Sequence, residues 1–247
     1  MYVFKEKEGC DLEKLAEIYS GKAKKLFQTT QENILLVEYL NQATALNGLR
    51  KDTVEGKAML NNQISAHIYQ YLNQKGHKTH FVEEVSPTQQ LVQALTIIPI
   101  EVVLRNITAG SFSKRFGIEE GIPLDKPIIE FYYKSDALDD PFINEDHVAF
   151  LAIASLKEIA TIKEMTLAIN ESLKDYFKQL DIILVDFKLE FGKDQDGNIV
   201  LADEISPDTC RLWDKNSHEH LDKDVYRRDL GDLVSVYQEV LNRIQAL

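Results

Sequence analysis

The 247-residue sequence has few cysteines and no long apolar run. Cys10 and Cys210 are too few for a disulfide framework or a zinc site. No apolar stretch approaches the ~20 residues that a membrane helix needs. The first residues, MYVFKEKEGCDLEK, also lack the apolar core of an export signal. We therefore expect a cytoplasmic protein that does not associate with a membrane.

Positive charge is scarce as well, because the chain has 28 Lys and Arg but 40 Asp and Glu, which gives a net charge of −12. Nucleic acids bind basic surfaces, so they are not expected as partners. In so acidic a chain, two basic clusters stand out: GKAKK at 21–25, and the span with Arg105, Lys114 and Arg115. Each lies beside a turn, which favours docking of a small anionic ligand over a solvated charged surface.

Apolar patterning divides the first part of the chain into strands and connections. Short strands are predicted within 15–40 and within 79–105, where Pro99 interrupts the run LTIIPIEVVLR. Residues 41–56 have no clear period and are predicted to form a mobile loop. Residues 106–147 are rich in turn residues and charges.

Three helices are predicted: from about Gly56 to Gly76, from the capping box Ser155-Leu-Lys-Glu158, and over about 224–246. Strands and helices do not alternate regularly, which favours an α+β fold with mainly antiparallel sheets and flanking helices. We expect two lobes, residues 1–98 and residues 99–247, joined near Pro99.

The segment Leu184–Asp214, LVDFKLEFGKDQDGNIVLADEISPDTCRLWD, is unusually rich in carboxylates. Alternation in its first strand separates two faces: Val185, Phe187, Leu189 and Phe191 on one, and Asp186, Lys188 and Glu190 on the other. Asp196-Gly197 predicts a two-residue hairpin turn. With that turn, Glu190 would lie directly opposite Asp203.

Opposed side chains in a sheet lie about 5 Å apart, a distance at which two carboxylates repel. A bound Mg²⁺ would remove this repulsion and leave coordination positions for water and phosphate oxygens. Two alternatives stay open. In the first, the two acids form an acid–base pair with one raised pKa. In the second, a longer loop in KDQDGN shifts the register and leaves the acids on an exposed face.

The segment SGKAKK at 20–25 matches neither the Walker P-loop nor a GxGxxG motif. A hairpin with Gly21 at its bend and Lys22 and Lys24 on one face suits a cover over a triphosphate, as in kinase-type folds. A solvated hairpin tip is the alternative.

The segment IIPIEVVLRNITAGSFSKR at 97–115 contains Arg105 and Ser111 beside a small Gly-containing turn. The planar guanidinium binds carboxylate or phosphate. Its alternative role is to close a strand by pairing with an Asp. Asp208 and Arg211, just past the second hairpin strand, add a second candidate anion contact.

The sequence resembles a known family. IIPIEVVLRNITAGS (97–111) and LVDFKLEFG (184–192) are similar to two signature stretches of phosphoribosylaminoimidazole-succinocarboxamide synthase, the SAICAR synthetase of purine biosynthesis. Further segments fit in the same order over about residues 15–243: YSGKAK, LNNQIS, GIEEGI, DDP, ADEISPD and RLWDK.

The resemblance implies a reaction and its participants. An ATP-dependent ligase would join the carboxylate of the phosphoribosyl-aminoimidazole carboxylate CAIR to the amine of L-aspartate. The products would be SAICAR, ADP and phosphate, formed through an acyl phosphate in a cleft between two lobes. ATP and Mg²⁺ are the implied cofactors. CAIR and aspartate are the implied partners, and a homodimer is left open.

The resemblance also implies roles for individual residues. Gly21, Lys22 and Lys24 would cover the phosphates with help from Lys134, and Ile97 would lie near the adenine. Glu190 and Asp203 would hold Mg²⁺. The residues implied to bind CAIR are Arg105, Ser111, Asp186, Asp208 and Arg211.

Lys188 would lie beside the reacting carboxylate, and Asp186 is one choice for the base that deprotonates the amine. Arg50 would bind aspartate or close the site, and Arg227 is a further anion contact. Relatives with an Asp-Gly pair have an acidic side chain where this chain has Asn47-Gly48, so that role is not carried over. A small-molecule kinase and a non-catalytic nucleotide-binding module remain alternatives.

Overall fold

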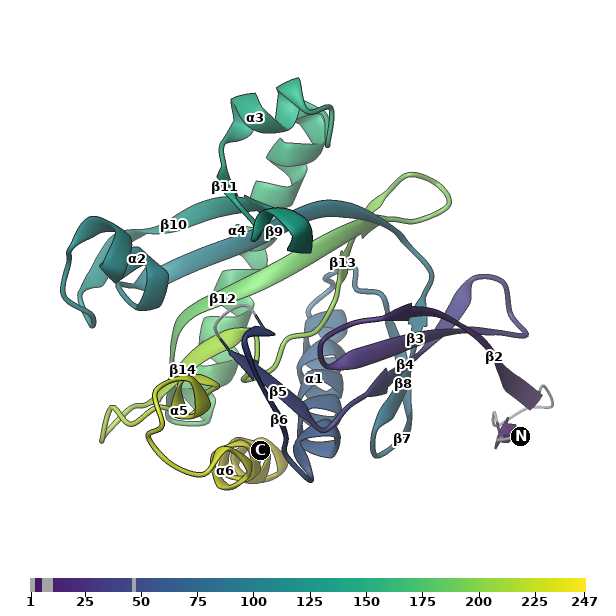
Figure 1. The fold of residues 1–247 in the computed structure, drawn as a ribbon, viewed down its shortest axis with the longest axis horizontal. Coiled ribbons are helices and arrows are strands. Elements are labelled where there is room, and N and C mark those ends of the chain that lie inside the picture. The colour runs from purple at the N-terminus through teal and green to yellow at the C-terminus, as the bar shows by residue number, and fades with distance from the viewer. Residues whose placement is uncertain (1–2, 6–10, 46–47) are drawn as a thin grey trace.

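The computed structural model describes residues 3–5, 11–45 and 48–247, so Cys10 and Asn47 lie outside the described residues. Two large antiparallel sheets dominate it (Figure 1). The first has the strand order β1-β2-β3-β4-β8-β7 and the second β11-β10-β9-β12-β13, with β14 also paired to β12. This arrangement confirms the α+β prediction.

The first sheet is built from the N-terminal third of the chain. Its strands are β1 (Val3–Lys5), β2 (Asp11–Ser20), β3 (Lys24–Thr29), β4 (Ile34–Tyr39), β7 (Phe81–Ser86) and β8 (Gln89–Gln93). Consecutive strands β2, β3 and β4 pair as neighbours, because short turns connect them.

The second sheet contains the strands that carry six of the predicted site residues: Ile97, Arg105, Asp186, Lys188, Glu190 and Arg211. They are β9 (Thr96–Ile107), β10 (Pro123–Tyr133), β11 (Phe142–Ile143), β12 (Ile182–Lys193), β13 (Ile199–Ala202) and β14 (Cys210–Asp214). β10 lies in the region predicted to be turns, where its alternation is weak.

Pro99 does not interrupt the chain as predicted, because β9 runs through it. It lies where the register of β9 against β12 shifts, between the pairs Ile97–Gly192 and Glu101–Glu190. A proline at a bulge removes no ladder hydrogen bond, so the strand tolerates it. The boundary between residues 98 and 99 therefore falls within β9, and the division into two lobes stays a prediction.

The predicted helices at residues 57 and 155 are confirmed as α1 (Lys57–Gln74) and α4 (Leu156–Gln179). Shorter helices are α2 (Gly110–Phe116) and α3 (Glu145–Phe150), and Asp136–Leu138 forms a 3₁₀ turn. None of the helices in the described part of the chain combines the length and the apolar character that crossing a bilayer demands.

The single C-terminal helix predicted over 224–246 is wrong. The chain forms α5 (Asp224–Arg227) and α6 (Leu233–Gln245), with a break between them. Asp229 adopts a left-handed φ of 55°, which ends the first helix. The Asp232 side chain then accepts a 2.8 Å hydrogen bond from the backbone N–H of Ser235 and caps the second.

The loop predicted at 41–56 is also wrong, because it forms a two-stranded sheet of β5 (Gln42–Ala45) and β6 (Arg50–Thr53). Ala43 and Ala45 alternate into the core at 0% and 6% exposure. Alanine has low strand propensity, so this alternation gave a weak signal in the sequence.

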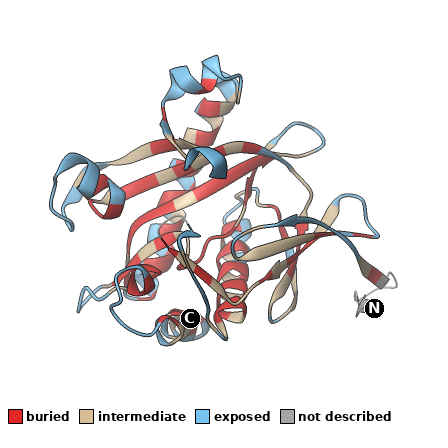
Figure 2. Cartoon of the chain, viewed as in Figure 1, coloured by how far each residue is buried: buried red, intermediate tan, exposed pale blue. Residues whose placement is uncertain are grey.

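The main core joins the elements around both sheets. α1 packs on β4 and β7 of the first sheet and on α6, while α4 packs on β9 and β12 of the second (Figure 1). Apolar residues from these elements form one continuous cluster, which appears as the red segments of α1, β9 and β12 in Figure 2. The second sheet is therefore fixed on one face and free to carry polar groups on the other.

The carboxylate-rich hairpin forms, but its register differs from the prediction by one residue. The loop covers residues 194–198, so Asp196-Gly197 is not a two-residue turn. The Asp194 carboxylate accepts hydrogen bonds of 3.0 and 2.8 Å from the backbone N–H groups of Asp196 and Asn198. These bonds stabilise the longer loop.

A bulge also changes the face of Val185. The register of β12 against β14 shifts between Leu184 and Asp186. Val185 consequently packs with Ala109 and Trp213 instead of joining the main core with Phe187. The extra residue of a bulge reverses the alternation, which periodicity alone does not reveal.

The capping box at α4 gives a testable pH dependence. Glu158 accepts hydrogen bonds from the backbone N–H and the hydroxyl of Ser155 and pairs with Lys193, which lowers the pKa of Glu158 to about 2. Because the pKa of Glu158 is lower in the folded state, the charged side chain stabilises the fold above its unfolded-state pKa of 4.5. This stabilisation is lost as the pH falls towards 2.

We predict that Glu158→Gln lowers the free energy of unfolding by about 1 kcal/mol at pH 6. Urea unfolding at pH 6 and at pH 3.5 checks this, with Glu164→Gln on the same helix as the control. A loss for Glu158→Gln that stays constant between these pH values contradicts the assignment.

Candidate active site

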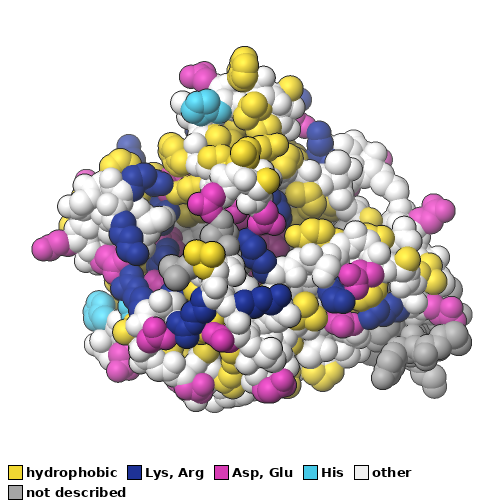
Figure 3. Space-filling view, viewed as in Figure 1, with side chains coloured by type: hydrophobic (Ala, Val, Ile, Leu, Met, Phe, Trp, Pro, Cys, Tyr) yellow, Lys and Arg dark blue, Asp and Glu magenta, His cyan; other side chains and the backbone are white. Residues whose placement is uncertain are grey.

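A cavity of about 850 Å³ lies between the two sheets. One wall is apolar and comes from β2, β3, β4, β8 and the start of β9: Ile18, Leu26, Leu35, Val37, Val92 and Ile97. The opposite wall is charged, and lysine and arginine side chains gather around a hollow in this face with carboxylates beside them (Figure 3). The cavity therefore offers a slot for a flat apolar group that ends in charges.

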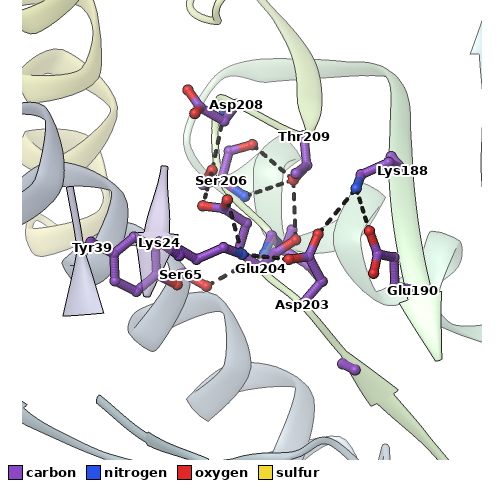
Figure 4. Close-up of polar contacts among 12 residues, drawn as sticks. Lys24, Tyr39, Ser65, Lys188, Glu190, Asp203, Glu204, Ser206, Asp208 and Thr209 are labelled. Carbon is purple, nitrogen blue, oxygen red and sulfur yellow. Dashed lines mark hydrogen bonds and ion pairs between the residues drawn. The ribbon is translucent and has the colours of Figure 1, made fainter. Parts of the chain in front are cut away.

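Lys24 of β3 connects the first sheet to the charged wall. Its Nζ pairs closely with Asp203 Oδ1 and lies 3.2 Å from Glu204 Oε1 (Figure 4). Burial acts to lower the pKa of Lys24, but the carboxylates of Asp203 and Glu204 outweigh it and hold that pKa well above its usual value. Lys24 is therefore a fixed positive charge.

Lys188 of β12 bridges three carboxylates. Its Nζ lies 2.7 Å from Glu190 Oε1, 3.1 Å from Glu101 Oε1 and 3.2 Å from Asp203 Oδ2. Burial acts to lower its pKa, and these three acids reverse that effect and raise it well above its usual value. Lys134 pairs with the second oxygen of Glu190.

The carboxylate directly opposite Glu190 is not the predicted one. Glu190 pairs with Ala202 on β13 and with Glu101 on β9, so the opposed acids belong to β9 and β12. Asp203 follows β13 and has a left-handed φ of 64°, which turns it out of the strand alternation and into reach of Lys188. Glu101, the one acid in the apolar run 96–104, was missed by sequence reasoning.

This wall fits a hard divalent cation. Burial raises the pKa of Asp203, but Lys24, Lys188 and Lys134 outweigh burial and keep it well below its usual value. Carboxylate oxygens from different strands converge here, and they are the ligands that Mg²⁺ takes. Lysines that share these acids can equally bind phosphate oxygens.

Asp186 organises a second, buried group of residues. It lies opposite Arg105 of β9 and Arg211 of β14 in the register of the central strand. Its Oδ2 is 2.9 Å from the nearest guanidinium nitrogen of each arginine. Arg105 also donates to Glu130 at 2.7 Å and to Ser111 at 3.0 Å. The predicted alternative, an arginine that pairs with an Asp across strands, describes Arg105 well.

The structure thus separates the predicted residues into groups. Those that line the cavity are Gly21, Lys22, Lys24, Ile97, Lys134, Lys188, Glu190, Asp203, Asp208 and Arg227. Arg105, Ser111, Asp186 and Arg211 cluster together but are not among the lining residues. Arg50 lies elsewhere, with its guanidinium 4.1 Å from the Tyr226 ring centroid and 2.8 Å from Asp229.

A buried network behind Asp208 was also missed. Asp208 Oδ2 accepts from Lys57 Nζ at 2.6 Å and Oδ1 accepts from the Tyr237 hydroxyl at 2.6 Å. Lys57 is 1% exposed although it begins α1. Its charge in a first helical turn conflicts with the helix dipole, which is a signal that could have marked it in the sequence.

Comparison with known proteins now identifies the class. A family model described as SAICAR synthetase matches residues 17–244. A phosphoribosylaminoimidazole-succinocarboxamide synthase of Streptococcus thermophilus (strain CNRZ 1066) is 61% identical over 230 residues, covering 93% of this chain and 97% of the relative. The Enterococcus faecalis synthase is 58% identical over 233 residues, covering 94% and 98%.

Solved structures agree. The crystal structure of the synthase from Ehrlichia chaffeensis has a TM-score of 0.91 at 46% identity and covers 94% of this chain and 99% of that chain. A SAICAR synthetase in complex with ADP has a TM-score of 0.90 at 49% identity and covers 93% and 97%.

Fold and site together define an enzyme of the ATP-dependent ligase class. The chain belongs to the SAICAR synthetase family of purine biosynthesis, and the resemblance seen in its sequence is confirmed.

Gly110 provides a test of the arginine group. Its φ is 57°, and a Cβ there would lie 2.3 Å from Arg211 Nη2. Gly117 has a similar φ of 64° with nothing within 4 Å of its Cβ position. We predict that Gly110→Ala costs about 1–3 kcal/mol more unfolding free energy than Gly117→Ala, because only the first displaces a guanidinium. Equal losses in urea unfolding would contradict this.

Proposed function

We propose that this protein joins CAIR to L-aspartate with ATP to form SAICAR, ADP and phosphate. The observation that carries the proposal is the charged wall, where lysines and carboxylates from both sheets meet at the end of an apolar slot. Such a wall suits transfer of a phosphoryl group, and family membership supplies the reaction.

The apolar slot would take the adenine, with Ile97 beside it. The β2–β3 hairpin of the N-terminal lobe, residues 1–98, would cover the phosphates through Gly21, Lys22 and Lys24. These residues line one cavity with Lys134, which supports a shared role. The similar SAICAR synthetase solved with ADP supports nucleotide binding here.

Glu190 and Asp203 would hold Mg²⁺. Glu101 lies near both acids, because the Lys188 ammonium group pairs with all three carboxylates. Bound there, the ion would neutralise negative charge on the phosphates. Lys24 and Lys134 would exchange part of their pairing with the acids for phosphate oxygens. The amine of Lys24 stays charged, because the neighbouring acids raise its pKa well above its usual value, and it would stabilise the phosphoryl group as it moves.

CAIR would bind at the C-terminal lobe, residues 99–247, through Arg105, Ser111, Arg211 and Asp208. Lys188 would lie beside the carboxylate that receives the phosphoryl group. Asp186 accepts hydrogen bonds from two arginines. We therefore propose that it positions them for the substrate.

The reaction needs an activated carboxylate, because oxide is a poor leaving group. Transfer of the γ-phosphoryl group from ATP would form a C–O–P linkage and release ADP. The neutral amine of aspartate would then attack the acyl carbon, form the C–N bond and expel phosphate. A cavity closed by the β2–β3 hairpin would keep water from the acyl phosphate.

Product identification tests the proposal. We expect ADP and a succinocarboxamide product only when ATP, CAIR and aspartate are all present, as followed by mass spectrometry with each omitted in turn. Stable phosphate transfer to a hydroxyl without an amide product would favour a small-molecule kinase instead.

Glu190→Gln tests the metal assignment. We predict that kcat falls about 100- to 1,000-fold, because one anionic ligand is lost, while the urea midpoint changes little. Titration of Mg²⁺ should show a higher requirement than in the wild type. The control is Glu83→Gln on β7, outside the cavity. Unchanged Mg²⁺ dependence in Glu190→Gln would remove this residue from the site.

A further inference from the structure

Lys57 is a buried charge that the proposed mechanism leaves without a role. It is the first residue of α1, and its side chain is 1% exposed. This position is unfavourable for a cation, because the N-terminus is the positive end of the helix dipole. Removal of the charge from water adds a further cost. A contact outside α1 must therefore explain why a lysine is buried here.

That contact is with the carboxylate of Asp208, in the loop between β13 and β14. Lys57 Nζ donates to Asp208 Oδ2 at 2.6 Å, and the Tyr237 hydroxyl donates to Oδ1 at 2.6 Å. Tyr237 belongs to α6, which packs against α1, so two helices bring donors to one carboxylate. The backbone N–H of Asp208 also donates to the Ser206 hydroxyl at 3.1 Å (Figure 4). The carboxylate is thus fixed at both oxygens and through its backbone.

The two donors lie behind Asp208 as seen from the cavity. Asp208 is one of the lining residues, whereas Lys57 and Tyr237 are not. Lys57 can therefore act on a ligand in the cavity only through Asp208. Each carboxylate oxygen can accept about two hydrogen bonds, so Oδ1 can still accept one from a ligand after Tyr237 has donated.

The charge of Asp208 depends on these neighbours. Burial acts to raise the pKa of Asp208, but the charges of Lys223 and Lys57 and the hydrogen bonds from Lys57 and Tyr237 outweigh it and hold that pKa well below its usual value. Lys57 makes the shorter of the two lysine contacts, since Lys223 Nζ lies 3.4 Å from Oδ2. Other charged groups near this set are Arg227, Asp222 and Glu204.

We propose that Lys57 is a positioning residue for the ligase reaction, which keeps the Asp208 carboxylate ionised and directed at a hydroxyl or amine group of CAIR. This assignment rests on the proposed function, in which Asp208 contacts CAIR. An ion pair buried only for stability could be replaced by apolar side chains of similar size without loss. A positioning pair differs from it in one respect, because it makes CAIR binding depend on the charge of Asp208.

Lys57→Met tests this role, with Lys75→Met as the control. Lys75 is exposed and lies at the C-cap of the same helix. We expect Lys57→Met to weaken CAIR binding about 10- to 100-fold and to change ADP affinity less than about twofold. Lys75→Met should bind both as the wild type does. Calorimetry of the full-length protein with ADP, Mg²⁺ and CAIR, without aspartate, measures binding in the absence of turnover.

The pH dependence separates positioning from a general loss of structure. Without Lys57 the pKa of Asp208 rises, so its carboxyl group takes up a proton as the pH falls. We expect the CAIR affinity of Lys57→Met, relative to the wild type, to fall about a further 10-fold between pH 8 and pH 6. Tyr237→Phe keeps the charge of Lys57, so its relative affinity should stay constant over this range.

A double-variant cycle shows whether Lys57 acts through Asp208. Lys57→Met and Asp208→Asn each leave one buried charge without its partner, whereas the double variant leaves neither. We expect the double variant to unfold at a higher urea concentration than either single variant. It should also bind CAIR no more weakly than Asp208→Asn does.

Three results would overturn the proposal: equal CAIR affinity in Lys57→Met and the wild type, additive losses of CAIR affinity in the double variant, or a steep fall with pH in Tyr237→Phe. The last two stand even if Lys57→Met alone does not fold. A wild type that binds CAIR but forms no amide with ATP and aspartate would reject the proposed function instead, and would leave the role of Lys57 at Asp208 intact.

Discussion

Like-charged carboxylates held side by side on neighbouring strands are the constraint on which this structure depends. Glu101 and Glu190 lie directly opposite each other on β9 and β12, and Asp203 approaches from the end of β13. Lys188 lies between all three and makes this arrangement possible. Lys24 extends the same pairing to the first sheet through Asp203, so the charges that shape the site also tie the two sheets together.

Charge is divided within the site. At the carboxylate wall, acids and lysines balance, and a cation or a polyphosphate can exchange with existing partners. The Arg105–Asp186–Arg211 group is buried and internally paired, which fixes its geometry before a ligand arrives. Around α5, Lys223 lies 3.4 Å from Asp208 and Arg227 lies 2.6 Å from Asp224. The charged groups of the site thus lie in separate clusters.

These buried ion pairs do not explain stability. The free-energy cost of removing two charges from water is about as large as the gain from their attraction. Apolar residues of similar size in the same place often give equal stability. Stability comes instead from the continuous cluster around α1, α4, β9 and β12. The side chains of Lys57, Asp208 and Asp186 are only 1%, 6% and 5% exposed, so burial against that core holds each of them in one position.

Local chemistry alone determined much of this protein. The capping box at Ser155 and the 3.6-residue period of α1 and α4 depend on neighbours in the chain, so the sequence predicted these helices. It also predicted the α+β fold, the family, and Lys188 and Glu190 on one face of β12. The tertiary structure decided which acid faces Glu190, which arginines hold Asp186, and that Lys57 reaches Asp208. Those partners are distant in sequence, and register, bulges and loop length select them, because a shift of one residue changes every cross-strand neighbour.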